Sequence, residues 1–154
     1  MIFKLRLKKS KGIWFYGLSG SGKTHISKSL KKKIKNSVIV DGDNVRKLIS
    51  KDLGYSQKDR EIQINRIFGI SKIIIESNKF PIISTVFMNQ KVNNLCKKNK
   101  IKCVMVIRDN FIDIKKKHKT YKNKSNVVGK DIFFGNFKKF KLFNDNTPIT
   151  FNIS

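Results

Sequence analysis

The sequence predicts a three-layer α/β fold, in which helices flank a mainly parallel central sheet of about five strands. Two observations carry this prediction. Short apolar runs alternate along the chain with longer amphipathic segments. The first such run, Ile13–Tyr16, leads directly into a glycine-rich stretch and then into an amphipathic segment, His25–Ile34. A strand, a glycine-rich turn and a helix in this order are typical of a phosphate-binding loop.

The glycine-rich stretch matches the G-x-x-x-x-G-K-[ST] pattern of phosphate-loop (P-loop) NTPases. It reads Gly17-Leu18-Ser19-Gly20-Ser21-Gly22-Lys23-Thr24. Its three glycines permit positive φ angles and a close approach of the backbone to a ligand, so that the N–H groups form an anion nest at the positive end of the next helix. We expect Lys23 to reach the β- and γ-phosphates of ATP and Thr24 to bind Mg²⁺. An ordinary Gly/Ser turn is the alternative, but the flanking strand and helix favour the phosphate loop.

The length of 154 residues suits one domain, 1–154, with a basic lead-in at 1–12. No apolar run is long enough to span a bilayer, and the N-terminus is too interrupted by charge for a signal peptide. We therefore expect a cytoplasmic protein without a membrane partner. Cys96 and Cys103 have no metal or redox spacing, and we interpret them as buried free thiols in a reducing compartment.

The formal net charge is +25. A charge of this size is compatible with binding to nucleic acid or to an anionic membrane. However, the chain contains no alanine and is rich in Lys, Ile, Asn and Phe, as an AT-biased coding sequence would be, and its lysines are scattered over every segment. We favour codon bias together with steering of an anionic substrate, and we do not expect a dedicated nucleic-acid surface.

The other elements follow from periodicity and turn signals. A β-branched run, Ser37–Asp41, is typical of a buried parallel strand. Helices are expected from Ser56 or Gln57 to Ser77, at Asn89–Asn99 and at Asp109–Lys117. Strands are expected at Phe80–Phe87 and Ile101–Ile107, with a short edge strand at Ile2–Leu7. The fifth strand of the sheet is expected from Phe140–Phe143 or from Pro148–Ile153.

Two carboxylates, Asp41 and Asp43, flank Gly42 at the end of the strand 37–41, where open α/β sheets bind ligands. One interpretation is a turn followed by a helix with Asp43 as its N-cap. The other is functional: beside a phosphate loop, one acid can position Mg²⁺ while the second accepts a proton from an attacking hydroxyl. The two interpretations are compatible. Arg46 lies one helical turn further on and suits an anionic substrate group.

The segment 118–125 is a run of Lys, Thr, Tyr, Asn and Ser without apolar periodicity. In a P-loop kinase a mobile basic lid, here about 118–130, would close over the phosphates at this point. A solvated loop is an equally good interpretation of the same residues. Neither His25 nor His118 has a sequence partner that indicates a metal site or a catalytic triad.

Taken together, these residues resemble adenylylsulfate (APS) kinases, which transfer the γ-phosphoryl group of ATP to the ribose 3′-hydroxyl of adenylyl sulfate. The resemblance covers roughly residues 12–145 and rests on motifs in the family's order. They are G-L-S-G-S-G-K-T at 17–24, D-G-D-N-V-R at 41–46, L-G-Y-S-x-x-D-R at 53–60 and a weaker N-V-V-G-x-D at 126–131.

The resemblance implies a kinase with ATP and Mg²⁺ as cofactors and 3′-phosphoadenylyl sulfate as product. It implies that Lys23 and Thr24 bind phosphate and Mg²⁺, that Asp41 serves the metal, and that Asp43 is the base. Arg46 and Arg60 would hold the phosphosulfate, and Tyr55 would stack on the nucleotide base. The remaining implied substrate-binding residues are Gln63, Ser84, Val127 and Gly129.

The departures from the family pattern concern the acceptor more than the phosphate loop. Gln63 replaces a substrate-binding Asn, Val127 aligns with a base-stacking Phe, and Phe87-Met88-Asn89-Gln90-Lys91 replaces I-S-P-[FY]-R. Two alternatives therefore stay open. One is a related kinase of another nucleotide acceptor, such as cytidine diphosphoramidate. The other is a non-catalytic nucleotide- or RNA-binding protein. The expected partner is a small-molecule nucleotide, and a homodimer also stays open.

Overall fold

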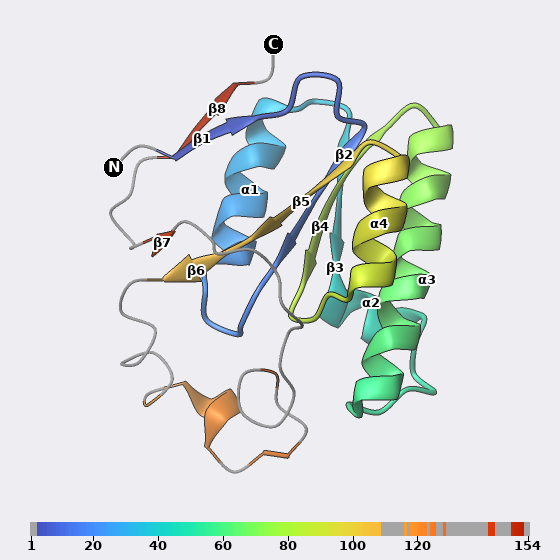
Figure 1. Cartoon of the computed structure of the whole chain (residues 1–154), viewed down its shortest axis with the longest axis vertical. Helices are drawn as coiled ribbons and strands as arrows, with labels where there is room; N and C mark the ends of the chain where they lie inside the picture. The colour runs from blue at the N-terminus through green and yellow to red at the C-terminus, as the bar shows by residue number, and fades with distance from the viewer. Residues whose placement is uncertain are drawn as a thin grey trace.

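A computed structural model of the chain describes residues 3–108, 116, 118–122, 124–125, 128, 142–143 and 149–152. Its centre is a sheet of four parallel strands in the order β3-β4-β2-β5 (Figure 1). These strands are β2 (Gly12–Tyr16), β3 (Ser37–Asp41), β4 (Phe80–Thr85) and β5 (Ile101–Met105). The predicted α/β class with a parallel central sheet is confirmed.

Helices cover both faces of this sheet (Figure 1). One face is covered by α1 (Lys23–Lys33), and the other by α3 (Gln57–Glu76) and α4 (Gln90–Lys98). The short helix α2 (Gly42–Leu48) follows β3 directly, at the carboxyl end of that strand. The arrangement is therefore three-layered, as the sequence predicts.

The alternation of side chains along β2 explains why its sequence is continuously apolar. Ile13 and Phe15 belong to the core cluster shared with α1, whereas Trp14 and Tyr16 belong to the cluster shared with α3 and α4. All four are buried. Because successive side chains of a strand point to opposite faces, a strand covered on both faces needs apolar residues at every position.

The beginning of α3 is defined by a capping box. Ser56 is the N-cap: its Oγ accepts a hydrogen bond from the Asp59 N–H, and the Asp59 carboxylate accepts one from the Ser56 N–H. The predicted start of this helix is confirmed. The cap fixes the first turn of α3, which carries Arg60, and Gln63 follows in the next turn.

The segments expected to supply a fifth strand pair elsewhere. Leu142–Phe143 (β7) pairs with β6 (Ile107–Arg108), and Ile149–Asn152 (β8) pairs with β1 (Phe3–Arg6), each in a separate two-stranded sheet. The strand expected over 101–107 is interrupted at Val106, whose N–H donates to the Tyr16 carbonyl. The central sheet therefore has four strands among the described residues. The helix expected at 109–117 lies almost entirely outside them.

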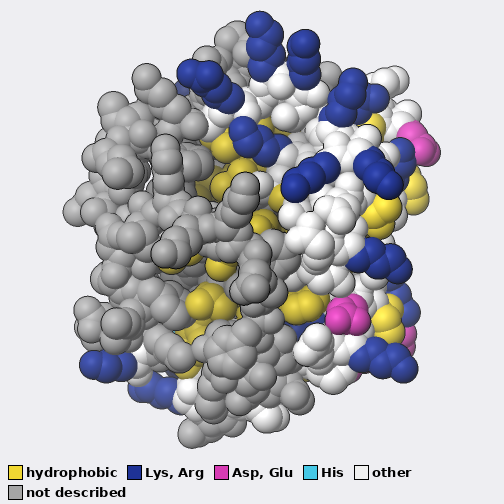
Figure 2. Space-filling model, viewed as in Figure 1, with side chains coloured by type: hydrophobic (Ala, Val, Ile, Leu, Met, Phe, Trp, Pro, Cys, Tyr) yellow, Lys and Arg dark blue, Asp and Glu magenta, His cyan; other side chains and the backbone are white. Residues whose placement is uncertain are grey.

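Basic side chains spread over the described part of the face in Figure 2, with few acidic ones between them. In the part of the chain that the structure describes, the acidic residues all lie between Asp41 and Glu76. Of the two free cysteines, Cys96 is buried as expected, but Cys103 is only half-buried. Among the described helices, none combines the length and the apolar character that crossing a bilayer requires.

Candidate active site

A cleft of about 270 Å³ opens at the carboxyl ends of the central strands. Its walls come from five segments of the chain: the phosphate loop, the start of α2, the region 55–64, the end of β4, and residues 118 and 120. The structure thereby gathers most of the predicted site residues around one space. These residues are Ser19, Gly20, Lys23, Thr24, Asp41, Asp43, Arg46, Tyr55, Arg60, Gln63 and Ser84.

The phosphate loop has the backbone that its glycines predict. Gly17, Gly20 and Gly22 have φ angles of 149°, 87° and 95°. A Cβ atom on Gly17 would lie 2.4 Å from the Val106 carbonyl oxygen, closer than real Cβ contacts allow. The first position of the motif is therefore restricted to glycine by both backbone conformation and space.

Lys23, in the first turn of α1, folds back over the loop. Its Nζ donates to the carbonyl oxygens of Gly17 at 2.7 Å and Leu18 at 2.9 Å. Burial lowers the pKa of Lys23 to about 8, although Asp43 and Asp41 act in the opposite direction. Because the Lys23 ammonium is hydrogen-bonded to neutral carbonyls and not to a carboxylate, its positive charge is available to bind an anion.

The carboxylates at the end of β3 have different surroundings. Asp41, and not Asp43, is the N-cap of α2: its Oδ1 accepts hydrogen bonds from the N–H groups of Asp43 at 2.9 Å and Asn44 at 3.2 Å. The prediction of Asp43 as the cap is wrong, because the helix begins at Gly42, two residues before the start that an Asp43 cap would give. Asp43 instead presents an exposed side chain in the wall of the cleft.

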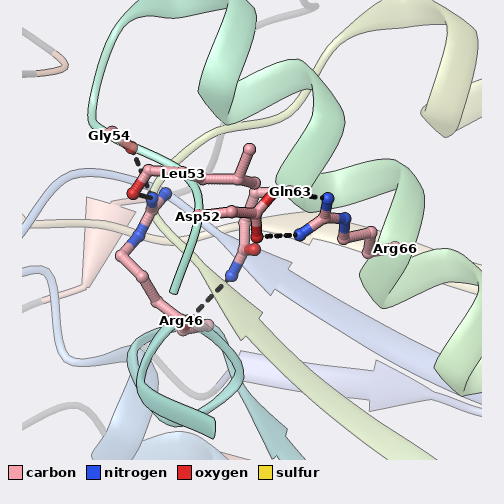
Figure 3. A network of polar contacts seen from close by, with 7 residues as sticks. Arg46, Asp52, Leu53, Gly54, Gln63 and Arg66 are labelled. Carbon is pink, nitrogen blue, oxygen red and sulfur yellow. Dashed lines mark hydrogen bonds and ion pairs between the residues drawn. The ribbon is translucent and has the colours of Figure 1, made fainter. Parts of the chain in front are cut away.

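Another wall of the cleft, here called the arginine wall, is formed by Arg46, Arg60 and Tyr55, and both guanidinium groups lie close to the Tyr55 ring. The Arg46 Cζ lies 4.5 Å from the ring centroid, and the Arg60 Cζ lies 5.6 Å from it. Backbone carbonyls hold both side chains: Arg46 donates to Leu53 and Gly54 (Figure 3), and the Arg60 Nε donates to Tyr55. Burial, followed by the neighbouring charge of Arg46, lowers the pKa of Arg60. The arginine wall therefore places two positive charges beside the exposed Tyr55.

Gln63 connects this wall to the start of α2. Its Nε2 donates to the Gly42 carbonyl at 3.0 Å (Figure 3). Its Oε1 is buried and has no hydrogen-bond partner among the described residues. A buried acceptor of this kind is costly unless a ligand donates to it. Ser84, also predicted, is buried, and its Oγ lies 2.7 Å from the Ser27 Oγ of α1.

Several residues of the site were not singled out from the sequence. Thr85 lines the cleft; it accepts from the Trp14 Nε1 at 2.7 Å and donates to the Phe87 carbonyl at 2.8 Å. His118 and Thr120 line it as well. Both lie in the segment 118–130 that the sequence predicts as a lid, although neither was named as a site residue. Two predicted residues, Val127 and Gly129, lie outside the described residues.

Comparison with known proteins agrees with this geometry. Residues 9–126 match the family model of adenylylsulphate kinase. The adenylyl-sulfate kinase of Staphylococcus haemolyticus is 43% identical over 82 residues, which are 51% of this chain and 41% of that protein. Adenylyl-sulfate kinase 3 of Arabidopsis thaliana is 32% identical over 115 residues, 72% of this chain and 52% of that protein.

A solved structure shares the fold. The APS kinase of Mycobacterium tuberculosis in complex with AMPPNP and APS matches 92% of this chain and 88% of its own, with a TM-score of 0.59 and 20% sequence identity. The chain spans about half the length of the curated relatives that it matches. Since the family model extends over well more than half of the chain, this protein belongs to the adenylylsulphate kinase family.

Proposed function

We propose that this protein transfers the γ-phosphoryl group of ATP to the ribose 3′-hydroxyl of adenylyl sulfate, giving ADP and 3′-phosphoadenylyl sulfate. One observation carries the proposal: a single cleft has a phosphate loop on one wall and two arginines around an aromatic ring on another. The M. tuberculosis kinase of the same fold binds both AMPPNP and APS. A cytoplasmic location, where ATP is available, is part of the proposal.

The phosphate loop supplies the donor side. Its N–H groups and the dipole of α1 favour an anion, and Lys23 would exchange the Gly17 and Leu18 carbonyls for the β- and γ-phosphates. Mg²⁺ is usually held by one or two protein oxygens together with phosphate oxygens and water. Thr24 and Asp41 line the cleft and offer such oxygens. When bound, the ion would neutralise charge on the transferred group.

The arginine wall supplies the acceptor side. Arg46 and Arg60 would bind the phosphosulfate of adenylyl sulfate, since guanidinium groups match such planar oxygen pairs. Tyr55 would stack on the nucleotide base, an interaction worth roughly 1–3 kcal/mol. The free Oε1 of Gln63 would accept a hydrogen bond from a hydroxyl or amine of the nucleotide. Ser84, Val127 and Gly129 complete the proposed acceptor site.

We assign the role of base to Asp43, which lines the cleft together with residues of both walls. Its carboxylate would accept the proton of the 3′-hydroxyl as the oxygen attacks the γ-phosphorus in line with the leaving ADP. The bond between the γ-phosphorus and the bridging oxygen breaks, ADP keeps that electron pair, and Asp43 later returns its proton to solvent. Lys23 would stabilise the negative charge on the phosphoryl oxygens during transfer.

ATP consumption in the presence of Mg²⁺, measured with and without adenylyl sulfate, tests the proposal. We expect turnover to depend on adenylyl sulfate and the new phosphate to be removed by a 3′-nucleotidase. ATP binding without this dependence would contradict adenylyl sulfate as the acceptor and would indicate another nucleotide. Failure to bind ATP at all would contradict a kinase function.

A further inference from the structure

We propose that Tyr121 is a positioning residue that holds the phosphate-binding loop in its ligand-binding shape through the Ser19 carbonyl. This inference rests on the proposed function, because it concerns the affinity of the same loop for ATP. It assigns a role to a tyrosine that lies about a hundred residues beyond the loop in the sequence. The role is to orient the backbone of the loop, without contact to a phosphate.

The contact joins two distant parts of the chain. Tyr121 ends the short 3₁₀ turn Lys119–Tyr121, drawn in orange beyond the carboxyl ends of the strands in Figure 1. Its hydroxyl donates to the Ser19 carbonyl oxygen at 3.0 Å. The side chain is 8% exposed, and burial raises the pKa of Tyr121 to about 12. The phenol is therefore a hydrogen-bond donor throughout the working pH range.

Three successive carbonyls of the loop accept hydrogen bonds from side chains. Lys23 donates to the carbonyls of Gly17 and Leu18, and Tyr121 donates to the next carbonyl, that of Ser19. In a trans peptide unit the C=O and N–H groups point in opposite directions. Holding the Ser19 carbonyl therefore also fixes the direction of the Gly20 N–H, one of the groups that form the anion nest.

The hydrogen bonds that Lys23 and Tyr121 donate to the loop should respond differently to the binding of ATP. Lys23 would leave its carbonyls to reach the phosphates, which releases its hold on the first two peptide units. Tyr121 holds the Ser19 carbonyl, which points away from the N–H of the same peptide unit, so this hydrogen bond is compatible with a bound phosphate. Tyr121 is thus the contact that continues to order the loop in the ATP complex.

The segment around Tyr121 is itself ordered against the cleft. His118 is the N-cap of the turn, and its Nδ1 accepts a hydrogen bond from the Thr120 N–H at 3.3 Å. The rings of His118 and Tyr121 meet edge to face, with centroids 5.9 Å apart. Because His118 and Thr120 line the cleft, the turn both borders the site and ties itself to the loop.

The first test compares ligand affinities of Tyr121→Phe and of the control Lys79→Gln, which removes an exposed charge just before β4, at the amino end of the sheet and away from the cleft. Losing one hydrogen bond should weaken AMPPNP binding about fivefold in Tyr121→Phe, and adenylyl sulfate binding by less than about twofold. The control should bind both ligands as the wild type does. An unchanged affinity of Tyr121→Phe for AMPPNP would overturn the proposal.

The second test needs no ligand. In protein labelled with ¹⁵N-glycine, Tyr121→Phe should move the amide resonance of Gly20 and leave that of Gly69, which has nothing within 4 Å of its Cβ position, unchanged. An unmoved Gly20 resonance would also overturn the proposal. If the wild type does not bind AMPPNP, the proposed function fails, and the Gly20 resonance still decides whether Tyr121 positions the loop.

Discussion

The two walls of the cleft are built by different means. The phosphate loop, which is the proposed ATP-binding or donor wall, takes its shape from the backbone, because three glycines have positive φ angles. Gly17 fits against Val106 only because it has no side chain. The arginine wall is the proposed acceptor wall. On the acceptor wall the shape is made by side chains. Arg46 and Arg60 are held by carbonyls of the segment 53–55, and Tyr55, whose ring both approach, is 55% exposed.

This difference explains how the two walls tolerate change. A backbone nest can be built by only a few residue types, so its sequence pattern is narrow and a match is informative. A wall of side chains can keep its position while one residue changes, because each side chain, such as Gln63 with its hydrogen bond to the Gly42 carbonyl, is held by its own contacts. We therefore expect substitutions on the donor wall to damage the whole loop and those on the acceptor wall to act on one ligand.

The largest expected effect belongs to Asp43, which lies between the two walls. Asp43→Asn removes the proposed base while keeping its size, so kcat should fall by roughly 10²–10⁴-fold. Because Asp43 is exposed and does not cap α2, the affinity for AMPPNP and the stability of the fold should change little. Steady-state kinetics and a titration of AMPPNP measure the two effects. An equal loss in kcat and in ATP affinity would remove Asp43 as the base.

Gly17→Ala tests the backbone origin of the donor wall. The added Cβ would meet the Val106 carbonyl at a φ angle unfavourable to alanine, so the free energy of unfolding should fall by about 2–3 kcal/mol and AMPPNP binding should be lost with it. The matched control is Gly69→Ala, in an open position of α3, which should stabilise the protein by about 0.5–1 kcal/mol. Denaturant unfolding measures both. Similar effects at the two positions would contradict the steric argument.

Arg60→Gln tests the side-chain origin of the acceptor wall. Removing a charged donor should raise KM for adenylyl sulfate about tenfold to a hundredfold, with KM for ATP nearly unchanged. Arg66→Gln is the control on the same helix, because Arg66 pairs with Asp52 at 2.7 and 2.8 Å (Figure 3) and is not among the residues that line the cleft. Its kinetic constants should stay within about twofold of the wild type. A comparable rise in KM for ATP after Arg60→Gln would contradict the assignment of Arg60 to the adenylyl sulfate site alone.

The smallest expected effect is a pH dependence of ATP binding. With its pKa lowered to about 8 by burial, Lys23 of the free protein loses its proton as the pH rises through that value. Bound phosphates favour the charged form, so binding above pH 8 must take up a proton and should weaken by up to about tenfold per pH unit. Calorimetry in two buffers of different ionisation enthalpy measures this uptake. An affinity that stays constant to pH 9 would contradict it.

The sequence predicted the backbone of the phosphate loop and its flanking elements well because the residues that make them are local. The strand, the loop and the start of α1 are consecutive in the chain, and the three glycines indicate their own φ angles. The capping box at Ser56 was predictable for the same reason. Longer-range pairings were not: β7 and β8 have strand-like sequences, but periodicity does not say that they pair with β6 and β1.

At the site, the errors concern which of several polar groups makes a given hydrogen bond. Both Asp41 and Asp43 can cap a helix, and a shift of two residues in the start of α2 decides between them. Tyr121 lies in a polar run without periodicity. Its contact with Ser19 joins two segments that are far apart in the sequence, so local sequence patterns could not predict it.

The most direct test of the two-wall account is a titration of adenylyl sulfate into the protein saturated with AMPPNP and Mg²⁺. If the donor and acceptor walls bind different molecules, adenylyl sulfate should still bind, with one molecule per chain and a finite heat. If the two ligands compete, so that saturation with AMPPNP abolishes adenylyl sulfate binding, the cleft has a single nucleotide site. That result would contradict the account.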